Sequence, residues 1–353
     1  MISVRKILEE IGKICTSAPC RIDAGGTWDI KAIALPFEGI FPTTVNMAID
    51  LRTYVYVLPF DEGYIKIVSR GFEPEIIPYS ELNFTSPYGI FIAAVRYFGF
   101  HGLEIQIDSK APVKSGLGGS STALVAVIKA LSEIKKYIDG KDTTKEQILY
   151  LAYHIEDGIS GGGCGAQDQG AAVYGGVNQW IWKYSKPTIC DRIPLLSQDN
   201  IKKLSNNIVV LYSGKSHISS EINQKWIREF LSGKTQKGWI KVNQVVREFA
   251  DAISKMELKK AVEYLKEEVS IRKKITPDAF TPFTEKLIEQ AQDIGCGARF
   301  TGAGAGGSVW AIGEKKDIQK LKSVWQKSID KIPEALLLEC KIDCEGVKLH
   351  SNS

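Results

Sequence analysis

The chain has 353 residues, of which 44% are hydrophobic and 24% are charged. This length suggests about two domains, and the composition excludes a collagen-like, disordered or disulfide-dense protein. The 45 Lys and Arg residues exceed the 41 Asp and Glu residues by only four, an excess too small to indicate nucleic acid or a membrane as partner.

The first twenty residues predict a short amphipathic helix and no targeting signal. Apolar residues recur there at helical spacing, with Lys and Glu between them, at Val4, Ile7, Leu8, Ile11 and Ile14. A signal peptide would need a continuous apolar core, and a transmembrane helix would need roughly 18–20 apolar residues in a row. The seven cysteines are odd in number and form no CxxC pair, which favours reduced thiols in a cytoplasmic protein.

The first half of the chain reads mainly as strands. Segments rich in Val, Ile and Tyr between residues 40 and 67, and the alternation from Leu103 to Asp108, are typical of strands. Helices are predicted over residues 88–98, along the apolar stripe of residues 124–134, and from a capping box at residues 144–147 toward Glu156.

Helices dominate the second half. After a strand over Val209–Tyr212, residues 217–275 and 282–293 follow helical patterns, and a further helix precedes a strand at Ala335–Ile342. A strand-rich first half before a helix-rich second half predicts an α+β protein of two domains, with the boundary between residues 175 and 210.

A Gly- and Ser-rich loop at Pro112–Thr122 stands between a predicted strand and a predicted helix. The N–H groups at a helix N-terminus are unpaired and carry the positive end of the helix dipole, and glycines let them approach an anion. Such a site binds phosphate, with Ser120 and Ser121 as caps, phosphate ligands or Mg²⁺ ligands. The alternative is a tight turn with a Ser cap. Because a loop this rich in glycine is costly to order without a ligand, phosphate is favoured.

Two common phosphate motifs do not fit this loop. The Walker A pattern GxxxxGK[ST] is absent, because the two GK[ST] triplets, at 214–216 and 233–235, lack the earlier glycine. The dinucleotide pattern GxGxxG fails at Ser121, where its third glycine would stand. A later run at residues 302–307 contains GxGxxG, but a strand-like segment follows it instead of a helix. These patterns disfavour a nicotinamide-dependent dehydrogenase.

Two carboxylates flank a second glycine-rich loop at Gly161–Gly170. Glu156 precedes this loop near a helix end, and Asp168 follows a flexible turn within it. Such a pair can supply one metal ligand and one general base. Taken alone, a helix-end Glu and a turn Asp are the more common explanation.

Together, the three loops resemble the motifs of the GHMP kinase superfamily, which includes galactokinase, homoserine kinase, mevalonate kinase and phosphomevalonate kinase. The matching segments, in order, are Ala18–Asp29, Pro112–Ser121 and Gly297–Gly307, and they extend over nearly the whole chain. The run RIDAGGTWD and the segment Gln167–Asn178 are similar to L-fucokinases and D-glycero-D-manno-heptose-phosphate kinases. The resemblance therefore implies a small-molecule sugar or sugar phosphate as substrate, with ATP and Mg²⁺ as cofactors.

The resemblance also implies a two-domain GHMP kinase fold within the α+β class. In that fold an N-terminal ribosomal-protein-S5-like α/β domain binds ATP and sugar, and a ferredoxin-like α+β domain follows it. We expect the first domain at residues 1–195 and the second at residues 196–353, and we regard a homodimer as possible.

Residue by residue, the resemblance implies a complete catalytic set. Asp168 matches the base that takes the proton from the sugar hydroxyl, and Arg21 matches the cation beside it. Ser120 and Glu156 match Mg²⁺ ligands. The ATP loop corresponds to Lys114, Gly116, Leu117, Gly118, Gly119, Ser120 and Ser121. The implied substrate contacts are Asp23, Gly25, Gly26, Asp29, Gly302, Ala303 and Gly304.

The leading hypothesis is an ATP- and Mg²⁺-dependent sugar kinase that phosphorylates the anomeric hydroxyl. One alternative is a catalytically inactive regulator that binds sugar and ATP on the same fold. Regulators of this kind usually lose catalytic residues. Because the set is present here at Arg21, Ser120, Glu156 and Asp168, the kinase is favoured. The dehydrogenase is the weaker alternative.

Overall fold

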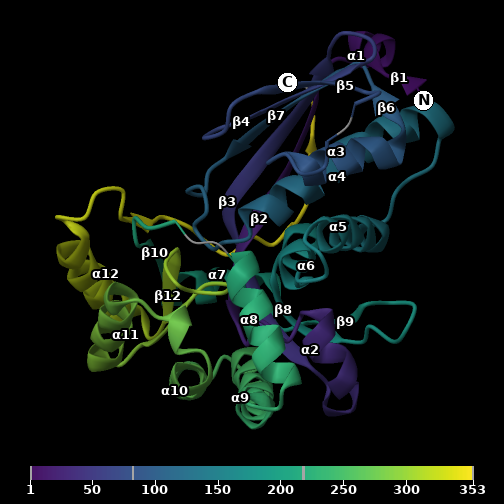
Figure 1. Ribbon diagram of the computed structural model, residues 1–353. Helices are drawn as coiled ribbons and strands as arrows, with labels where there is room; N and C mark the ends of the chain where they lie inside the picture. The colour runs from purple at the N-terminus through teal and green to yellow at the C-terminus, as the bar shows by residue number, and fades with distance from the viewer. Residues whose placement is uncertain (1, 82, 217–218, 352–353) are drawn as a thin grey trace.

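The computed structural model describes residues 2–81, 83–216 and 219–351. In these residues, eight strands form one large sheet in the order β14-β2-β3-β7-β4-β5, with β8 paired to β3 and β9 to β8 (Figure 1). Neighbouring strands run antiparallel except β4 and β7, which are parallel. The strands are β2 Ile14–Ala24, β3 Thr43–Pro59, β4 Tyr64–Ser69, β5 Glu75–Pro78, β7 Leu103–Ser109, β8 Val177–Trp182, β9 Cys190–Pro194 and β14 Lys348–His350.

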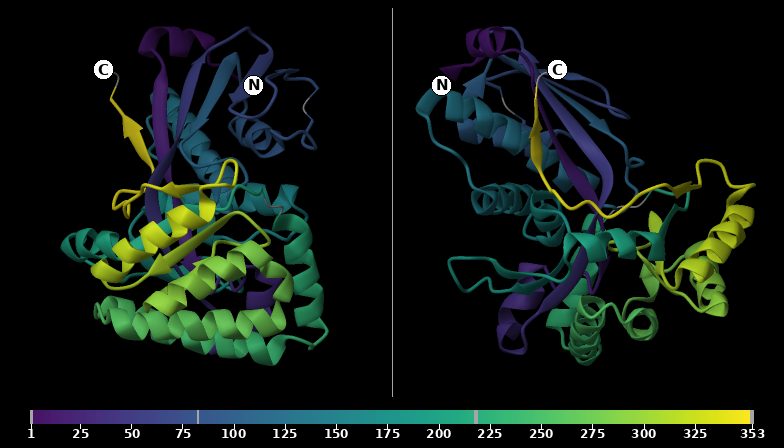
Figure 2. Two further views of the ribbon diagram at one scale, coloured as in Figure 1. Left: turned by 90° about the vertical axis from the view of Figure 1, so that its left-hand side faces the viewer. Right: turned by 180° about the vertical axis from the view of Figure 1, so that it is seen from behind.

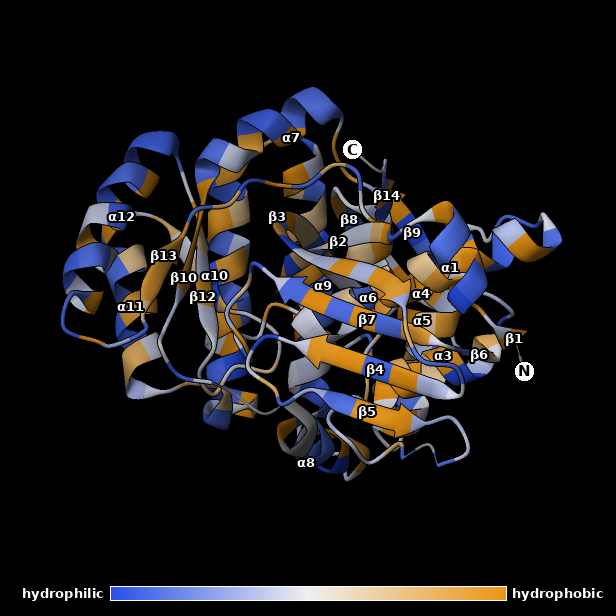
Figure 3. Ribbon diagram, turned by 90° about the horizontal axis from the view of Figure 1, so that it is seen from above, coloured by the Kyte–Doolittle hydropathy of each residue, from blue (hydrophilic) through white to orange (hydrophobic). Residues whose placement is uncertain are grey.

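Helices pack on one side of this sheet (Figure 1). Along β7 and β4, hydrophobic and hydrophilic residues alternate (Figure 3). They are α3 Gly89–Phe98, α4 Gly119–Asp139, α5 Lys145–Ile159 and α6 Gln167–Tyr174. The predicted apolar stripe from Leu124 to Ile134 is confirmed as the buried face of α4. The predicted capping box is confirmed at the start of α5, where the Gln147 backbone N–H donates to the Thr144 hydroxyl. The predicted strands of the first half correspond to β3, β4 and β7.

A smaller sheet and most of the remaining helices form the second part of the molecule. Its strand order is β11-β12-β10-β13, with β10 Ile208–Tyr212, β11 Gly297–Phe300, β12 Ser308–Ile312 and β13 Leu336–Leu338. The helices are α7 Gln198–Leu204, α8 Ser219–Leu231, α9 Gln236–Ser254, α10 Leu258–Ile275, α11 Pro282–Ile294 and α12 Lys315–Ile329. The predicted glycine-rich connection between two strands at 302–307 is confirmed, because it joins β11 to β12.

The remaining elements of the described residues are short. They are β1 Ile2–Ser3, β6 Phe100–His101, α1 Arg5–Ile11, α2 Lys31–Ala34 and the 3₁₀ turns Leu35–Ile40, Ser205–Asn207 and Pro277–Ala279.

The structure corrects three expectations from the sequence. Ile14 belongs to β2, because α1 ends at Ile11 and its C-cap Gly12 has a φ of +78°. The strand predicted at Ala335–Ile342 is confined to β13. Asp168 lies in the first turn of α6 and not in a loop. Residues 217 and 218, where the long helical pattern was expected to begin, lie outside the described residues.

The segment after β13 returns to the large sheet and pairs with its edge strand. β14 pairs with the edge of β2, and the segment runs up beside that strand (Figure 2). The buried Arg52 guanidinium pairs with the Asp343 carboxylate and donates to the Gly346 carbonyl at 2.6 Å. The Val347 backbone N–H donates to the Val173 carbonyl near the end of α6. Residues 343–350 therefore contact both β2 and α6. The domain boundary at residues 195/196 stays a prediction.

None of the helices described is both long enough and apolar enough to cross a membrane.

Candidate active site

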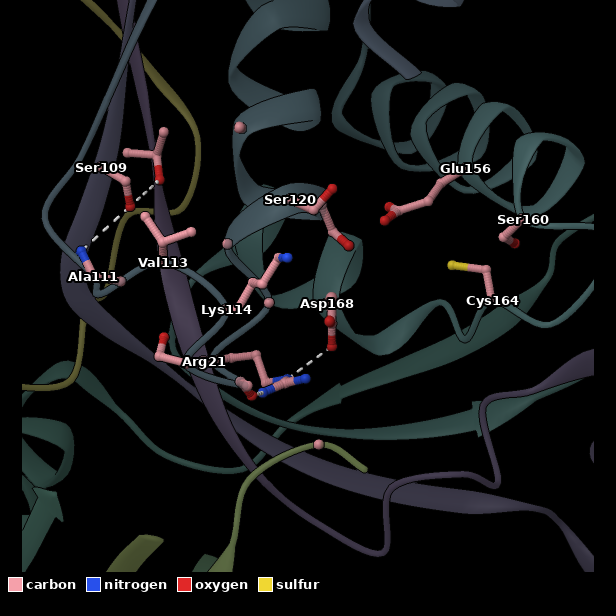
Figure 4. A pocket seen from close by; sticks show the side chains of 18 of the residues that line it. Arg21, Ser109, Ala111, Val113, Lys114, Ser120, Glu156, Ser160, Cys164 and Asp168 are labelled. Carbon is pink, nitrogen blue, oxygen red and sulfur yellow. Dashed lines mark hydrogen bonds and ion pairs between the residues drawn. The ribbon is translucent and has the colours of Figure 1, made fainter. Parts of the chain in front are cut away.

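A cavity of about 890 Å³ lies where the three glycine-rich segments meet (Figure 4). Its walls come from the turn after β2, the loop before α4, the facing ends of α5 and α6, the α8 helix and the loop between β11 and β12. Segments that lie far apart in the sequence thus share one enclosed space. Of the predicted site residues, those that line it are Arg21, Asp29, Lys114, Gly116, Gly118, Gly119, Ser120, Ser121, Glu156, Asp168, Gly302 and Ala303.

The first glycine-rich loop leads directly into the N-terminus of α4. Gly118 is the N-cap, with a φ of +76°, and no side chain caps the helix among the described residues. A Cβ at Gly118 would lie 3.0 Å from an Asp168 carboxylate oxygen. Glycine is therefore required both by the left-handed backbone and by the approach of Asp168. The N–H groups of the first turn have no acceptor within the helix, and Ser120 beside them lines the cavity, so this turn can bind an anion.

Arg21 and Asp168 face each other at the floor of the cavity. The Arg21 Nε donates to Asp168 Oδ1 at 2.7 Å, and its Nη1 donates to the Gly116 carbonyl at 2.6 Å (Figure 4). Burial lowers the pKa of Arg21, but the carboxylates of Asp168 and Asp23 outweigh it and raise that pKa above its usual value. Arg21 is a permanent cation held against a carboxylate that remains partly open to the cavity.

A buried chain of alternating charges continues behind Arg21. Asp23 Oδ1 lies 3.6 Å from Arg21 and accepts a hydrogen bond from the Gly302 backbone N–H at 2.8 Å. Asp23 Oδ2 accepts from Arg299 Nη1 at 2.9 Å, and Arg299 Nε donates to Glu268 at 3.1 Å. These carboxylates and guanidinium groups are essentially inaccessible to solvent. The chain links helix α10, through strands β11 and β2, to Asp168.

A second buried arginine holds the turn that follows β2. The Arg272 guanidinium lies over the rings of Trp239 and Trp226, at 4.4 and 4.6 Å, and donates to the Gly26 carbonyl at 3.1 Å. Burial lowers the pKa of Arg272 to about 9. The turn that leads to Asp29 is thus anchored on helix α10.

Asp29 lies beside the second glycine-rich loop, whose Cys164 is on the opposite side of the cavity from Ala111 and Val113 (Figure 4). Its carboxylate accepts hydrogen bonds from the Thr27 backbone N–H at 2.9 Å and from the Gln167 backbone N–H at 3.2 Å. Burial raises the pKa of Asp29 to about 6, and the nearby Asp168 carboxylate adds to the rise. A Cβ at Gly165 would lie 1.9 Å from an Asp29 oxygen, so Gly165 is needed for the close approach of the second glycine-rich loop.

Glu156 points from α5 toward Ser120 on α4 (Figure 4). Gln169 donates to its carboxylate at 2.7 Å. Burial raises the pKa of Glu156 to about 7, although hydrogen bonds from Ser121 and Gln169 oppose the rise. Among the residues that the structure describes, no group of three or more His, Cys, Asp or Glu side chains forms a metal cluster. Mg²⁺ commonly takes one or two protein carboxylates and completes its shell with substrate phosphates, so Glu156 and Ser120 fit such an ion.

Five predicted site residues lie outside the cavity lining. Leu117 is fully buried, and its carbonyl accepts from the Arg21 backbone N–H. Asp23 is occupied by the buried charge chain described above. Gly25 and Gly304 pack against Val246 and Ala279, and Gly26 packs against the Gln167 amide. These residues shape the site from behind.

Sequence reasoning missed several residues of this site. Gln167, Cys164, Asn223 and Gln224 line the cavity, and Phe72, Tyr88, Phe91, Ile107 and Val113 line an apolar arm of it. Arg299 carried a usable signal, because a charged residue inside the apolar strand β11 requires buried partners. The α8 residues carried none, because their position depends on how the two parts of the chain pack.

Family comparisons match both parts of the chain. A model described as "GHMP kinases N terminal domain" matches residues 87–176, and one described as "GHMP kinases C terminal" matches residues 246–331. The chain is 25% identical over 341 residues to mevalonate kinase of Pyrococcus horikoshii, covering 88% of this chain and 92% of that protein. It is 26% identical over 309 residues to D-glycero-alpha-D-manno-heptose 7-phosphate kinase of Campylobacter jejuni, covering 83% and 87%.

A further relative is much longer than this chain. The bifunctional fucokinase/GDP-fucose pyrophosphorylase of Arabidopsis thaliana is 25% identical over 229 residues, which cover 64% of this chain and only 21% of that protein. Among solved structures, Lactococcus lactis galactokinase in complex with galactose superposes with a TM-score of 0.73 at 16% identity, covering 98% of both chains. Streptococcus pneumoniae phosphomevalonate kinase superposes with a TM-score of 0.75 at 15% identity, covering 93% of this chain and 99% of that one. At these identities the structures establish the fold alone.

Proposed function

Because the chain belongs to the GHMP kinases and has their two-domain fold, it is a phosphotransferase with an alcohol group as acceptor, and we propose that it is an ATP- and Mg²⁺-dependent sugar kinase. The observation that carries the proposal is the Arg21–Asp168 pair, held at 2.7 Å beside the free N-terminus of α4 within one cavity. A proton acceptor and an anion site are thereby brought together as phosphoryl transfer requires.

Kinases of this family use ATP, and the cavity has room for it along the α4 loop. In our proposal the phosphates lie against the first turn of α4, with Lys114 above them and Gly302 and Ala303 closing from the opposite side. The adenine occupies the apolar arm, where Tyr88 and Phe91 supply flat apolar surface. Ser120 and Glu156 would hold Mg²⁺, which would supply positive charge to the β- and γ-phosphates.

The acceptor hydroxyl lies between Asp168 and the γ-phosphate in this proposal. Asp168 accepts the proton of that hydroxyl as the oxygen attacks the γ-phosphorus, and the bond from this phosphorus to the β–γ bridging oxygen breaks to release ADP. Arg21 holds the Asp168 carboxylate in place and offsets the negative charge that gathers on the transferring group. Asp23, predicted from the resemblance to touch the sugar, we now assign to positioning Arg21 and the Gly302 loop, because its oxygens already accept from those groups.

A sugar acceptor is supported by the kinship with the fucokinase and the heptose 7-phosphate kinase, each matched at 25–26% identity. The mevalonate kinases match at the same level, so mevalonate is the second candidate acceptor. A nicotinamide-dependent dehydrogenase is dropped, because β12 follows the 302–307 loop and the fold is that of a kinase. Phosphorylation at the anomeric position, the homodimer and the cytoplasmic location stay predictions.

A coupled ADP-release assay with Mg²⁺ and ATP tests the proposal. The acceptor panel is fucose, galactose, mannose, heptose 7-phosphate and mevalonate. We expect acceptor-dependent ADP release with at least one sugar and none without an acceptor. Sugar and ATP binding without ADP release across the panel would overturn the kinase and favour the inactive regulator. Release with mevalonate alone would overturn the sugar assignment and leave the kinase intact.

A further inference from the structure

One residue of the α4 loop has a backbone conformation that its side chain disfavours. Lys114 has a φ of +53°, in the left-handed region where a residue with a Cβ is strained. Strained residues of this kind persist only where their surroundings impose the conformation, and they gather at functional sites. Lys114 lines the cavity, so the strain directs attention to what its side chain does there.

The two residues after Lys114 are held by other parts of the site. The Gly116 carbonyl accepts a hydrogen bond from Arg21 Nη1 at 2.6 Å. A Cβ at Gly307 would lie 2.7 Å from the Ser115 carbonyl oxygen, so the third glycine-rich loop packs directly on this segment. These contacts impose the turn at Lys114 and fix the point from which its side chain extends.

The ammonium group of Lys114 is a cation without a carboxylate partner. Its side chain points toward Ser120 in the first turn of α4 (Figure 4). Among the described residues it forms no ion pair, whereas the lining cations Arg21 and Lys110 each pair with a carboxylate at 2.7 Å. Arg70 also lines the cavity without such a partner in the described part of the chain, but it comes from the segment between β4 and β5. At the first turn of α4, Lys114 therefore offers a cation for which no described carboxylate competes.

The proton acceptor approaches the same turn. Asp168 lies so close to it that a Cβ at Gly118 would be 3.0 Å from the carboxylate. In the proposed kinase, the γ-phosphate and the acceptor hydroxyl meet between Asp168 and this turn. Negative charge spreads over the equatorial oxygens of a phosphoryl group in transfer, and a cation placed there lowers the energy of the transition state.

We propose that the Lys114 ammonium group donates a hydrogen bond to an oxygen of the γ-phosphoryl group as this group moves from ATP to the acceptor. Lys114 is then a catalytic residue and more than a contact for bound ATP. This inference rests on the proposed kinase function and deepens it. The bond changes and the proton transfer to Asp168 are those given above, and Lys114 keeps its own protons and supplies only charge.

The test compares Lys114→Met with Lys141→Met, which changes an exposed lysine between α4 and α5. With the best acceptor of the panel, Lys114→Met should lower the single-turnover rate of ADP formation about a hundredfold, because the lost charge acts on the group in transfer. Single turnover keeps product release out of this rate. The ATP KM should stay within about threefold. Lys141→Met should change neither value, and Lys114→Arg, which retains the charge, should lose less than about tenfold in rate.

Glycine separates the side chain of Lys114 from the backbone strain. Lys114→Gly should unfold at a urea midpoint equal to or above that of the wild type, because glycine adopts the left-handed conformation readily. Its single-turnover rate should nevertheless fall as far as that of Lys114→Met. Glu334→Gly is the matched control, since Glu334 is exposed, has a φ of +64° and lies outside the cavity lining. It should keep both its stability and its full activity.

The outcomes distinguish this inference from the proposed function. An unchanged single-turnover rate in Lys114→Met would overturn the inference and leave the kinase standing. A raised ATP KM with an unchanged rate would also overturn it, because Lys114 would then contribute to ATP binding alone. Absence of ADP release by the wild type with the whole acceptor panel would overturn the proposed function itself.

Discussion

One end of the cavity is formed mainly by backbone groups, and the other is formed mainly by side chains. The end at the α4 loop uses backbone N–H groups from one contiguous segment, residues 112–121, and needs glycines to expose them. The end at Asp29 uses side chains brought by the turn after β2, by α6 and by α8. A backbone site leaves a compact signature in the sequence. A side-chain site assembled from distant segments leaves almost none, because its residue types are ordinary and only folding brings them together.

The largest effect should come from the residue shared by both ends. Asp168→Asn keeps the shape but removes the proton acceptor, so kcat should fall about a thousandfold. The ATP KM should stay within about threefold, because Asp168 is not part of the α4 loop. Steady-state ADP release measures both values. Gln244→Asn, on the exposed face of α9, is the control, and substantial turnover by Asp168→Asn would contradict the role proposed for this carboxylate.

Only part of this site could be predicted from the sequence. The glycine pattern with its flanking strand and helix predicted the loop before α4. The resemblance named Arg21, Asp29, Glu156 and Asp168, and all four line the cavity. Asp23 lies outside the cavity lining, because Arg299, far along the chain, donates to its carboxylate, and no sequence pattern reveals that contact. The place of Gln167 in the cavity lining depends on packing against Gly26 and Asp29, which only the fold determines.

The buried charge chain behind Arg21 should be the next most sensitive feature. Arg299→Met leaves Asp23 and Glu268 as buried carboxylates without their main partner, and should lower the free energy of unfolding by about 3–5 kcal/mol. Urea denaturation measures this loss. Lys260→Met, which removes an exposed ion pair with Glu257, is the control and should leave the urea midpoint nearly unchanged.

A double variant separates charge from shape in that chain. Arg299→Met combined with Glu268→Gln removes one of the stranded carboxylates and should recover part of the lost stability. Simple additivity of the two losses would show that the guanidinium acts through packing and not through charge.

The Asp29 end should also be the part that responds to pH. Burial raises the pKa of Asp29 to about 6, so between about pH 4 and pH 6 the folded protein binds a proton that the unfolded chain releases. Stability without ligands should therefore fall as pH rises through this window. Because one pKa unit corresponds to about 1.4 kcal/mol, the wild type should lose about 2–3 kcal/mol more than Asp29→Asn between pH 4 and pH 7.

Denaturant unfolding at several pH values measures this difference directly. Glu156, with its pKa raised to about 7, contributes a similar slope to both proteins and cancels in the comparison. Asp61→Asn, an exposed position, should follow the wild type at every pH. Parallel pH profiles for the wild type and Asp29→Asn would contradict the burial of an ionisable carboxyl at this end.

The smallest effect should come from the backbone of the α4 loop. Gly118→Ala puts a Cβ into a left-handed residue and about 3.0 Å from the Asp168 carboxylate, which costs about 1–2 kcal/mol. The ATP KM should rise about tenfold in ADP-release kinetics. Gly158→Ala is the matched control, because nothing lies within 4 Å of its Cβ. Equal behaviour of the two alanine variants would contradict a backbone site at Gly118.

The return of residues 343–350 to the first sheet has a consequence for the order of biosynthesis. A ribosome makes Arg52 291 residues before Asp343, and it makes Ser17 at the β2 edge 333 residues before His350 of β14. Until then the nascent sheet has an open edge, Arg52 lacks its carboxylate, and the end of α6 lacks its last backbone anchor. Helix α6 begins with Gln167 and Asp168, so a chain that stops short of residue 343 carries every catalytic residue without the clamp that fixes them. The contacts that fasten β2 and α6 therefore form only after residues 343–350 have been synthesised.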